Sequence, residues 1–482
     1  MRLSDLIGHN GTASQIDIRG LTADSRAVEP GYLFAALPGT QVRGADYIGD
    51  ALDQGAVAVL AGPDVTVDPA QAYLVPDYNP RRRLALMAAR FFDAQPDTVV
   101  AVTGTNGKSS VVDFVRQIWA QLGHRAGSMG TLGVTADGID PMPSLTTPDP
   151  VEVHRRLADL KQAGIDHLAL EASSHGLAQH RLDGVQIKAA AFTNLSRDHL
   201  DYHATYEDYF LAKLRLFGDL LPPGGAAVLN AETPLFEELV DICWGRGLRI
   251  LSVGKGGDLA LLSREATPSG QALVIGLGDQ VYDVTLPLIG DFQTSNALVA
   301  AGLVLMTGGE PNPVMHALSG LSPVRGRLEH VGTHPNGAAV YVDYAHTPDA
   351  LRTVLTSLRP HTQGRLHLVF GCGGDRDSGK RPQMGAAAVE LADRVIVTDD
   401  NPRHEDPAEI RRQIMTASPG ALEVADRHAA IAKGLAGLQA DDLLVIAGKG
   451  HEQGQIIGDE VLPFDDAAVV RSALALLEDS RA

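Results

Sequence analysis

The sequence predicts an α/β protein built from three domains, and three observations support that prediction. The chain has 482 residues, which is enough for about three domains of ordinary size. Short runs of β-branched and small apolar residues alternate with helical segments, a pattern typical of parallel sheets covered by helices. The clearest apolar runs end in polar or glycine-rich clusters, and ligands of such folds bind where the strands end.

Residues 1–80 are expected to form a small N-terminal α/β domain. Short apolar runs at 31–36 and 56–60 predict strands separated by turn residues, and the polar turn 22–26 is expected to precede the first strand. A basic helix with apolar periodicity is expected over 80–92, and the first domain boundary is placed just before it.

Residues 81–326 are expected to form a central domain with a mostly parallel sheet, and residues 327–482 a C-terminal Rossmann-like, doubly wound domain. The strands predicted in the central domain cover 98–103, 166–171, 188–194 and 226–229. The alternation restarts in the C-terminal domain, where strands are expected over 338–342, 366–370, 394–398 and 443–447.

Composition excludes several classes of protein. A net charge of −19 argues against nucleic acid as a partner. The two cysteines form no disulfide framework or CxxC metal site, and no run of 18 apolar residues predicts a membrane span. The N-terminus lacks the apolar core of a signal peptide. We therefore expect a soluble, cytoplasmic protein, and a monomer.

The stretch Val99–Ser110, VVAVTGTNGKSS, predicts a buried strand, a tight glycine loop and a helix that begins at Ser109. Backbone N–H groups of the loop and the ammonium of Lys108 would together bind a phosphate, and the Ser109 hydroxyl could bind Mg²⁺. The standard phosphate loop has a glycine where Val102 stands here. An ordinary strand-to-helix turn with a solvated lysine is the alternative.

Five further polar clusters follow predicted strands. Glu171 is either a magnesium ligand or a helix cap, and the segment 193–203 either carries metal or proton chemistry or begins a solvated helix. In the segment 343–349, Thr347 and Pro348 fit a helix N-cap and first helical residue. The clusters 371–377 and 400–403 hold arginines and acids that would fit an amino-acid head group or would pair with each other.

Several of these motifs together resemble the Mur ligase superfamily. They are GTNGKS in the glycine loop, EASSH from Glu171, DYAHTPD from Asp343 and DNPR from Asp400. The superfamily comprises ATP-dependent amide-forming enzymes of peptidoglycan precursor synthesis and also folylpolyglutamate synthetase, and the resemblance spans residues 22–452. It implies an ATP-dependent acid–amino-acid ligase with Mg²⁺ as cofactor and a role in cell wall biogenesis, cell shape and division. Because the nucleotide sites would straddle the central and C-terminal domains, we also expect these domains to close on binding.

The resemblance also implies roles for individual residues. ATP would contact Gly104, Thr105, Asn106, Gly107, Lys108, Ser109, Ser110, Asn296 and Arg327. Magnesium would be held by Ser109, Glu171 and His199, and the catalytic group would be Lys108, Lys213, Arg327 and Asp343. Lys213 would be carbamylated, as N6-carboxylysine, and Asp343 would touch the ribose of ATP.

The same resemblance assigns two substrate sites. A UDP-muramyl dipeptide would contact Ala23, Ser25, Thr40, Gln41, Val42, Thr146, Thr147, Ser173, Gln179 and Arg181, although the family often has histidine where Thr40 stands. The DNPR form resembles that of members that add meso-diaminopimelate through an acyl phosphate. Its contacts would be Arg376, Asp400, Asn401, Pro402, Arg403, Gly448 and Glu452.

Three alternatives stay open. One is the lysine-adding member of the family that acts at the same step. The second is folylpolyglutamate synthetase, which DNPR and EASSH disfavour. The third is a nucleotide-binding regulator without catalysis.

Overall fold

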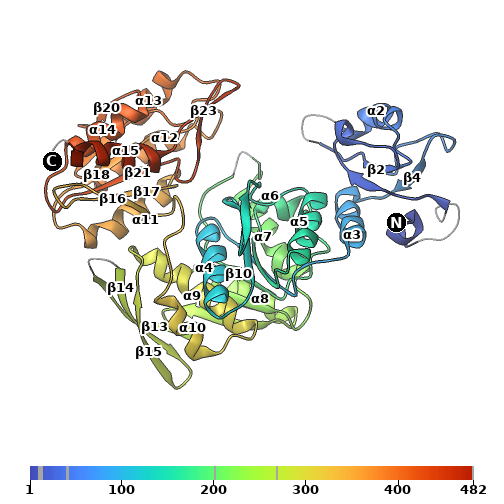
Figure 1. Cartoon of the computed structure of the whole chain (residues 1–482), viewed down its shortest axis with the longest axis horizontal. Coiled ribbons are helices and arrows are strands. Elements are labelled where there is room, and N and C mark those ends of the chain that lie inside the picture. The colour runs from blue at the N-terminus through green and yellow to red at the C-terminus, as the bar shows by residue number, and fades with distance from the viewer. Residues whose placement is uncertain (9–14, 40–42, 200–201, 268–269, 480–482) are drawn as a thin grey trace.

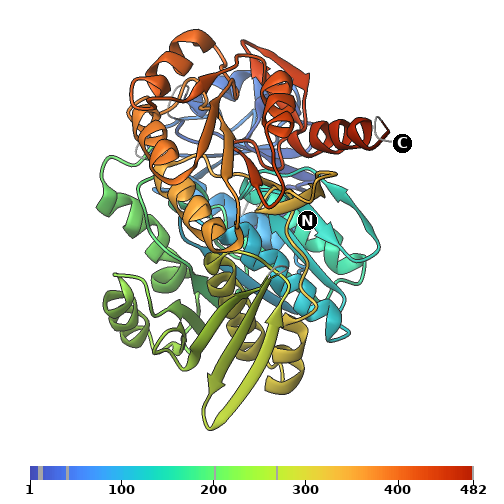
Figure 2. The same cartoon turned by 90° about the vertical axis from the view of Figure 1, so that its left-hand side faces the viewer.

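A computed structural model describes residues 1–8, 15–39, 43–199, 202–267 and 270–479. Three sheets lie along the longest axis of the molecule, with the N-terminal sheet at one end and the C-terminal sheet at the other (Figure 1). The view in Figure 2 shows the C-terminal elements above the central sheet, from which the β13–β15 strands project. The α/β fold class is therefore confirmed.

The N-terminal sheet has the strand order β1-β2-β3-β4 in the described residues, and all its pairs are parallel. Its elements are α1 (Leu3–Ile7), β1 (Gly20–Thr22), β2 (Tyr32–Ala35), α2 (Ile48–Asp53), β3 (Ala58–Ala61), β4 (Tyr73–Pro76) and α3 (Pro80–Phe92). The turn 22–26 follows the first strand, which corrects the expectation that it precedes it. Strand β1 has three residues and is too short for its periodicity to show in the sequence.

The central sheet has the order β15-β14-β13-β12-β11-β10-β5-β9-β6-β7-β8 over the described residues. Its strands are β5 (Thr98–Thr103), β6 (Ala126–Gly130), β7 (Gly133–Ala136), β8 (Ile139–Met142), β9 (His167–Glu171), β10 (Ala189–Phe192), β11 (Ala226–Asn230), β12 (Arg249–Gly254), β13 (Leu259–Thr267), β14 (Gly270–Leu277) and β15 (Gln280–Leu286). The middle strands are parallel, as predicted, while β13–β15 and β6–β8 pair antiparallel at the two flanks.

Helices cover both faces of the central sheet. They are α4 (Lys108–Gln121), α5 (Pro150–Gln162), α6 (Ser174–Ala178), α7 (Tyr206–Arg215) with a π-helical turn (Leu216–Leu220), α8 (Phe236–Gly245), α9 (Asp291–Met306) and α10 (Pro311–Leu318). Val100 and Val102 of β5 pack toward α4 and α9, while Val99 and Ala101 pack toward α5 and α7. Because successive side chains of a strand face opposite sides, this burial explains the continuous apolar run of β5.

The C-terminal sheet has the order β16-β17-β21-β18-β19-β20, parallel except for β16, within the described residues. Its strands are β16 (Glu329–Thr333), β17 (Ala339–Asp343), β18 (Leu366–Phe370), β19 (Arg394–Val397), β20 (Leu422–Glu423) and β21 (Leu443–Ala447), and a separate hairpin is formed by β22 (Gly454–Ile457) and β23 (Glu460–Pro463). The helices are α11 (Pro348–Leu358), α12 (Lys380–Leu391), α13 (Pro407–Met415), α14 (Arg427–Ala436) and α15 (Asp466–Asp479). The sheet is doubly wound, because α11–α13 pack on one face and α14 and α15 on the other.

No helix in the described part of the chain combines the length and the apolar character needed to cross a membrane.

Candidate functional site

The glycine loop joins β5 to α4 and has the geometry of an anion site. Helix α4 begins at Lys108, one residue earlier than expected, and Gly107 before it has φ 88°. A Cβ atom at Gly104 would overlap Thr193, and one at Gly107 would overlap Asn296, so both positions require glycine. The N–H groups of the first turn of α4, which have no partner within the helix, therefore lie at the loop.

Lys108 is held against its own loop. Its Nζ donates to the carbonyl oxygens of Gly104 at 2.9 Å and Thr105 at 2.8 Å. Burial lowers the pKa of Lys108, while the carboxylates of Glu171 and Asp198 oppose that shift. The ammonium is thus already positioned at the loop rather than extended into solvent.

Glu171, at the end of β9, is 2% exposed and lies beside the loop. Its Oε1 accepts hydrogen bonds from Ser109 Oγ at 2.9 Å and Thr131 N at 2.8 Å. The Ser109 hydroxyl also accepts from Nη2 of Arg327 at 3.2 Å. A hydroxyl and a carboxylate so placed are the hard oxygen donors that Mg²⁺ prefers.

Lys213 of α7 is 1% exposed and lies beneath the same loop. Its Nζ donates to Gly104 O at 2.8 Å and lies 4.4 Å from the ring centroid of Tyr209. Burial lowers the pKa of Lys213 well below its ordinary value, and the nearby charge of Lys108 lowers it further. The buried site therefore disfavours the charged form of the Lys213 side chain.

A cavity of about 820 Å³ opens over the loop, between the central and C-terminal sheets. It brings together most of the predicted ATP, metal and catalytic residues: Thr105, Asn106, Gly107, Lys108, Ser109, Ser110, Glu171, His199, Lys213, Asn296, Arg327 and Asp343. Four predicted muramyl-peptide residues line it as well: Thr146, Thr147, Ser173 and Arg181.

Both carboxylate oxygens of Asp343 accept hydrogen bonds from backbone N–H groups. Oδ1 accepts from Ala345 N and Oδ2 from Leu328 N, both at 2.7 Å. Burial raises the pKa of Asp343, and Arg327 opposes that shift. The guanidinium of Arg327 lies 4.3 Å from the ring centroid of Tyr344 and donates to Ser109 Oγ at 3.2 Å, so its charge lies at the loop.

An adjoining cavity of about 500 Å³ lies at the carboxyl edge of the C-terminal sheet, as predicted for its two arginine-bearing clusters. It shares with the first cavity the residues His175, Asp198, His199, Tyr344, His346, Asp349 and Arg376. Its own lining includes Asp400, Asn401, Arg403, Gly448 and Glu452, all five of them predicted. Nη1 of Arg403 donates to Gly374 O at 2.8 Å, which joins the two clusters.

A buried lysine organises the acids of this second cavity. Lys449 is 0% exposed, and its Nζ donates to Asn401 Oδ1 at 2.7 Å and Glu452 Oε2 at 3.3 Å. The Asp400 carboxylate lies 4.0 Å from the same ammonium. Two carboxylates and one lysine leave a net charge of about −1, which suits one substrate ammonium.

Left-handed backbone conformations gather around both cavities. Five residues other than glycine with positive φ are predicted site residues or their neighbours in the chain: His180, His199, Leu328, Asp375 and Arg403. Such conformations cost about 1 kcal/mol or more for these residue types and persist where surrounding contacts fix them. Arg403, with φ 52°, is fixed by hydrogen bonds from its N–H to Ile456 O at 3.0 Å and from Gly458 N to its carbonyl at 2.7 Å.

Three segments of the chain match models of known protein families. Residues 17–92 match the description "Mur ligase family, catalytic domain", residues 102–304 "Mur ligase middle domain", and residues 326–450 "Mur ligase, glutamate ligase domain". The chain belongs to the Mur ligase family. The resemblance drawn from the sequence motifs is confirmed.

Two curated relatives of this Mur ligase carry the same name. The proteins of Brucella melitensis and Agrobacterium fabrum are both named UDP-N-acetylmuramoyl-L-alanyl-D-glutamate–2,6-diaminopimelate ligase. The first is 51% identical over 466 residues, covering 96% of either chain. The second is 53% identical over 467 residues, covering 97% of this chain and 95% of that one.

One solved structure that carries the same name as these relatives has a TM-score of 0.72 and 32% identity and covers 99% of either chain. Folylpolyglutamate synthase of Mycobacterium tuberculosis, complexed with ADP, has a TM-score of 0.65 at 20% identity and covers 90% of this chain and 98% of that one. At that identity the second likeness shows the fold alone.

Some predicted residues lie outside the two cavities of this Mur ligase. Ala23 and Ser25 follow β1 in the N-terminal sheet, and Thr40, Gln41 and Val42 lie outside the described residues. Gln179 donates to Tyr202 OH at 3.0 Å and accepts from Arg181 at 2.8 Å. Gly104 and Pro402 shape the loops beside the cavities without lining them.

Sequence reasoning missed Thr131, Tyr209 and Lys449. Thr131 hydrogen-bonds Glu171 twice, through N and through Oγ1 to Oε2 at 3.2 Å. Tyr209 OH shares a hydrogen bond of 3.0 Å with Thr105 Oγ1. No local pattern marks these residues, although Lys449 lies between the predicted contacts Gly448 and Glu452.

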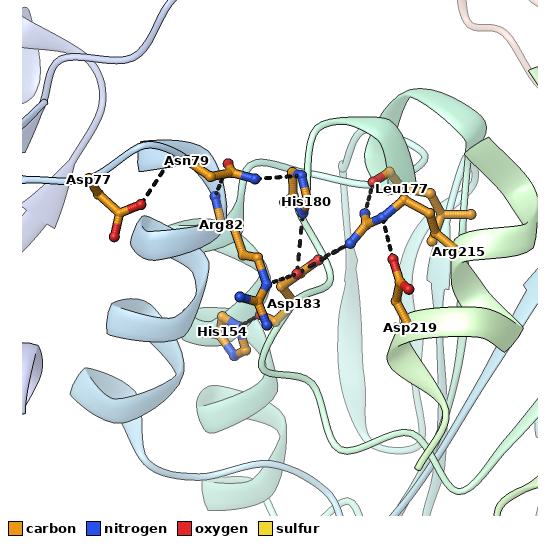
Figure 3. A network of polar contacts seen from close by, with 9 residues as sticks. All are labelled: Asp77, Asn79, Arg82, His154, Leu177, His180, Asp183, Arg215 and Asp219. Carbon is orange, nitrogen blue, oxygen red and sulfur yellow. Dashed lines mark hydrogen bonds and ion pairs between the residues drawn. The ribbon is translucent and has the colours of Figure 1, made fainter. Parts of the chain in front are cut away.

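A buried carboxylate fastens helix α3 to the central domain (Figure 3). Asp183 Oδ1 accepts from Arg82 Nε of α3 at 3.1 Å, and Asp183 Oδ2 accepts from Arg215 Nη2 of α7 at 3.2 Å. His180 lies 3.2 Å from Asp183 Oδ1 and 3.0 Å from Asn79 Nδ2. His180 stands between Gln179 and Arg181, so this network fixes the loop predicted to bind the muramyl peptide.

Replacing Asp183 by asparagine is expected to lower the free energy of unfolding by about 3 kcal/mol, because two arginines lose a buried counterion. Burial would raise the pKa of Asp183, but His180 and Arg215 hold it below its ordinary value of 3.8. A depressed pKa stabilises the fold above that value and loses its effect as pH falls through the folded pKa. Urea unfolding should therefore show a smaller difference between wild type and D183N at about pH 3 than at about pH 7.

The control for this prediction is D219N. Asp219 also pairs with Arg215, at 3.0 Å, but its side chain is 59% exposed. Its loss should cost under about 1 kcal/mol. Equal losses in D183N and D219N would contradict the role given to Asp183.

Proposed function

We propose that this Mur ligase joins meso-diaminopimelate to UDP-N-acetylmuramoyl-L-alanyl-D-glutamate with hydrolysis of ATP to ADP and phosphate. The observation that carries the proposal is the second cavity. It places the Arg403 guanidinium and the acids Asp400 and Glu452 beside the cavity of the phosphate loop. The names of the curated relatives support the same reaction.

In this proposal the phosphate loop and Lys108 bind the ATP phosphates, and Asn296 and Asp343 lie where adenosine would extend. The donor set fits Mg²⁺, since the Ser109 hydroxyl and the buried Glu171 carboxylate are 2.9 Å apart and face one cavity. His199 lines that cavity too and completes the proposed ligands. When bound, Mg²⁺ neutralises phosphate charge and polarises the γ-phosphoryl oxygens.

The first step brings two anions together. A glutamate carboxylate oxygen of the muramyl dipeptide attacks the γ-phosphorus, ADP leaves, and an acyl phosphate forms. Lys108 and Arg327 supply the fixed positive charge that this encounter requires, and charges already positioned need no reorganisation during the reaction. Thr146, Thr147, Ser173 and Arg181 would orient the dipeptide.

The second step forms the amide. An uncharged amine nitrogen of diaminopimelate attacks the acyl carbon, the phosphate leaves with the bond electrons, and the nitrogen loses a proton. The far end of diaminopimelate carries both an ammonium and a carboxylate. In this proposal Asp400, Glu452 and the Lys449 counterion accept the ammonium, and Arg403 with Arg376 binds the carboxylate.

The test is phosphate release from ATP with the UDP-muramyl dipeptide, comparing meso-diaminopimelate with L-lysine. We expect release with diaminopimelate and at least about 100-fold lower kcat/KM with lysine, because lysine leaves Arg403 without its carboxylate. Equal rates with lysine would overturn the selectivity and favour the lysine-adding reaction. ATP binding without phosphate release in either reaction would favour the non-catalytic alternative.

A further inference from the structure

A second group of ligating side chains lies at the opposite edge of the central sheet. His124 follows α4, and Asp166 and His167 stand at the start of β9. Each offers one donor atom such that the three atoms lie within 4.8 Å of one another. Glu171 is four residues along β9 from His167, which is about 13 Å in a strand. The group is therefore separate from the proposed magnesium site.

The backbone holds these residues together before any ion binds. The carbonyl oxygen of Arg125, next to His124, accepts from Asp166 N at 3.0 Å and from His167 N at 3.3 Å. His124 N donates in turn to Trp119 O at 3.0 Å, which ties the loop to the end of α4. The two chain segments that carry the donors are thus fixed relative to each other, and little ordering is needed on binding.

Contacts also orient the side chains, and one of the three is open to solvent. His167 Nδ1 lies 2.8 Å from Asp166 Oδ1, and the rings of His124 and His167 are 4.0 Å apart between centroids. The Trp119 ring contacts the His167 ring edge-on at 4.9 Å and limits its rotation. The side chain of Asp166 is 41% exposed, which leaves a path for a hydrated ion.

The chemistry of the three donors suits a transition metal, since they lie within 4.8 Å of one another. Two imidazole nitrogens and one carboxylate oxygen, with water at the remaining position, form a donor set that Zn²⁺ accepts, whereas Mg²⁺ and Ca²⁺ prefer oxygen.

We propose that His124, Asp166 and His167 form a binding site for Zn²⁺ or a chemically similar divalent transition metal. The ion would join the end of α4 to the start of β9. The other ends of the same two elements carry Lys108 and Ser109 on α4 and Glu171 on β9. The site would therefore brace the pair of elements that positions the phosphate loop, without touching the substrates.

The experiment is a Zn²⁺ titration of the full chain without an affinity tag, in excess Mg²⁺ and in competition with a chromophoric chelator. We expect one Zn²⁺ per chain in the micromolar range and at least about tenfold weaker binding in H124A and in H167A. The matched control is H316A, which removes an exposed histidine of α10 and should bind like wild type. Zn²⁺ should raise the Tm of wild type and H316A and leave that of H124A unchanged.

Two results would overturn the site. The first is no stoichiometric Zn²⁺ binding by wild type, which would leave Asp166 and His167 as a hydrogen-bonded pair. The second is undiminished binding in H124A and H167A, which would assign the ion to other histidines such as those around His175. If H167A fails to fold, H124A and D166N still test the site. The side chains of His124 and Asp166 are only partly buried, so their loss should leave the fold intact.

Discussion

Replacing Lys213 by alanine is expected to reduce phosphate release by about 100-fold or more, the loss typical of a missing charged group that acts on a transition state. The proposed reason is carbamylation. The neutral Lys213 nitrogen would attack the carbon of CO₂ and lose a proton, which turns a cation-forming side chain into an anion beside the phosphate loop. The carbamate would offset the charge of Lys108 and orient the magnesium ligands.

The fold should tolerate this change, and that separates the chemical role from a structural one. Lys213 is 1% exposed, and burial of its amine lowers its pKa well below the ordinary value, so the lysine costs stability in the unmodified chain. Its acceptor, Gly104 O, keeps a second donor in Lys108 Nζ at 2.9 Å. We therefore expect K213M, which keeps the side-chain volume, to unfold at the same urea concentration as wild type or a higher one.

Chemical rescue of K213A tests directly whether a carboxylate is needed at the position of Lys213. Short carboxylic acids added to K213A should restore part of the activity, because a carboxylate can enter the space left by the carbamate. The control is K255A, which removes an exposed lysine and should respond to no acid. Wild-type activity in K213A, or an equal response of both variants to the acids, would contradict carbamylation of Lys213.

Strands of the central sheet that are buried on both faces could be predicted from the sequence. Strands with one face exposed to solvent could not. Strand β5 has the predicted bounds 98–103. Its inner residues, Val99 to Val102, are fully buried and all apolar, so the strand shows in the sequence as a continuous apolar run. The segment 259–267 mixes exposed polar and apolar residues, such as Leu262 and Glu265, and belongs to an antiparallel flank. Its pattern alone does not distinguish that flank from a loop or a crossover.

Site residues that lie at the ends of strands could be predicted from the sequence. Site residues that are distinguished only by their burial could not. Glu171, Asp343 and Asp400 each follow an apolar run, and the parallel sheets bring them to the cavities. Lys213 and Lys449 look like ordinary helix and loop lysines in the sequence, and only tertiary packing buries them. Lys213 was therefore found through the family resemblance, and Lys449 was not found. The individual residue roles and the domain boundaries stay predictions.

Replacing Arg403 by methionine is expected to raise the KM for meso-diaminopimelate by about 100-fold and to leave the KM for ATP within about twofold. A carboxylate that loses its two parallel hydrogen bonds to a guanidinium loses about 3 kcal/mol of binding, which corresponds to that ratio. R403K, which keeps the charge without the planar fork, should fall between wild type and R403M. Steady-state kinetics with each substrate varied in turn provides the measurement.

The kinetics of R403M with L-lysine show whether Arg403 recognises the substrate or only supports the loop. Lysine has no distal carboxylate, so its slow reaction should be unchanged in R403M, and the preference for diaminopimelate should fall by the full 100-fold or so. The structural role is real, since Arg403 Nη1 donates to Gly374 O at 2.8 Å. If that hydrogen bond were its main contribution, R403M would lower Tm and impair both amino acids equally. The matched control is R412K, because Arg412 is 66% exposed and pairs with Glu409 on α13 away from both cavities.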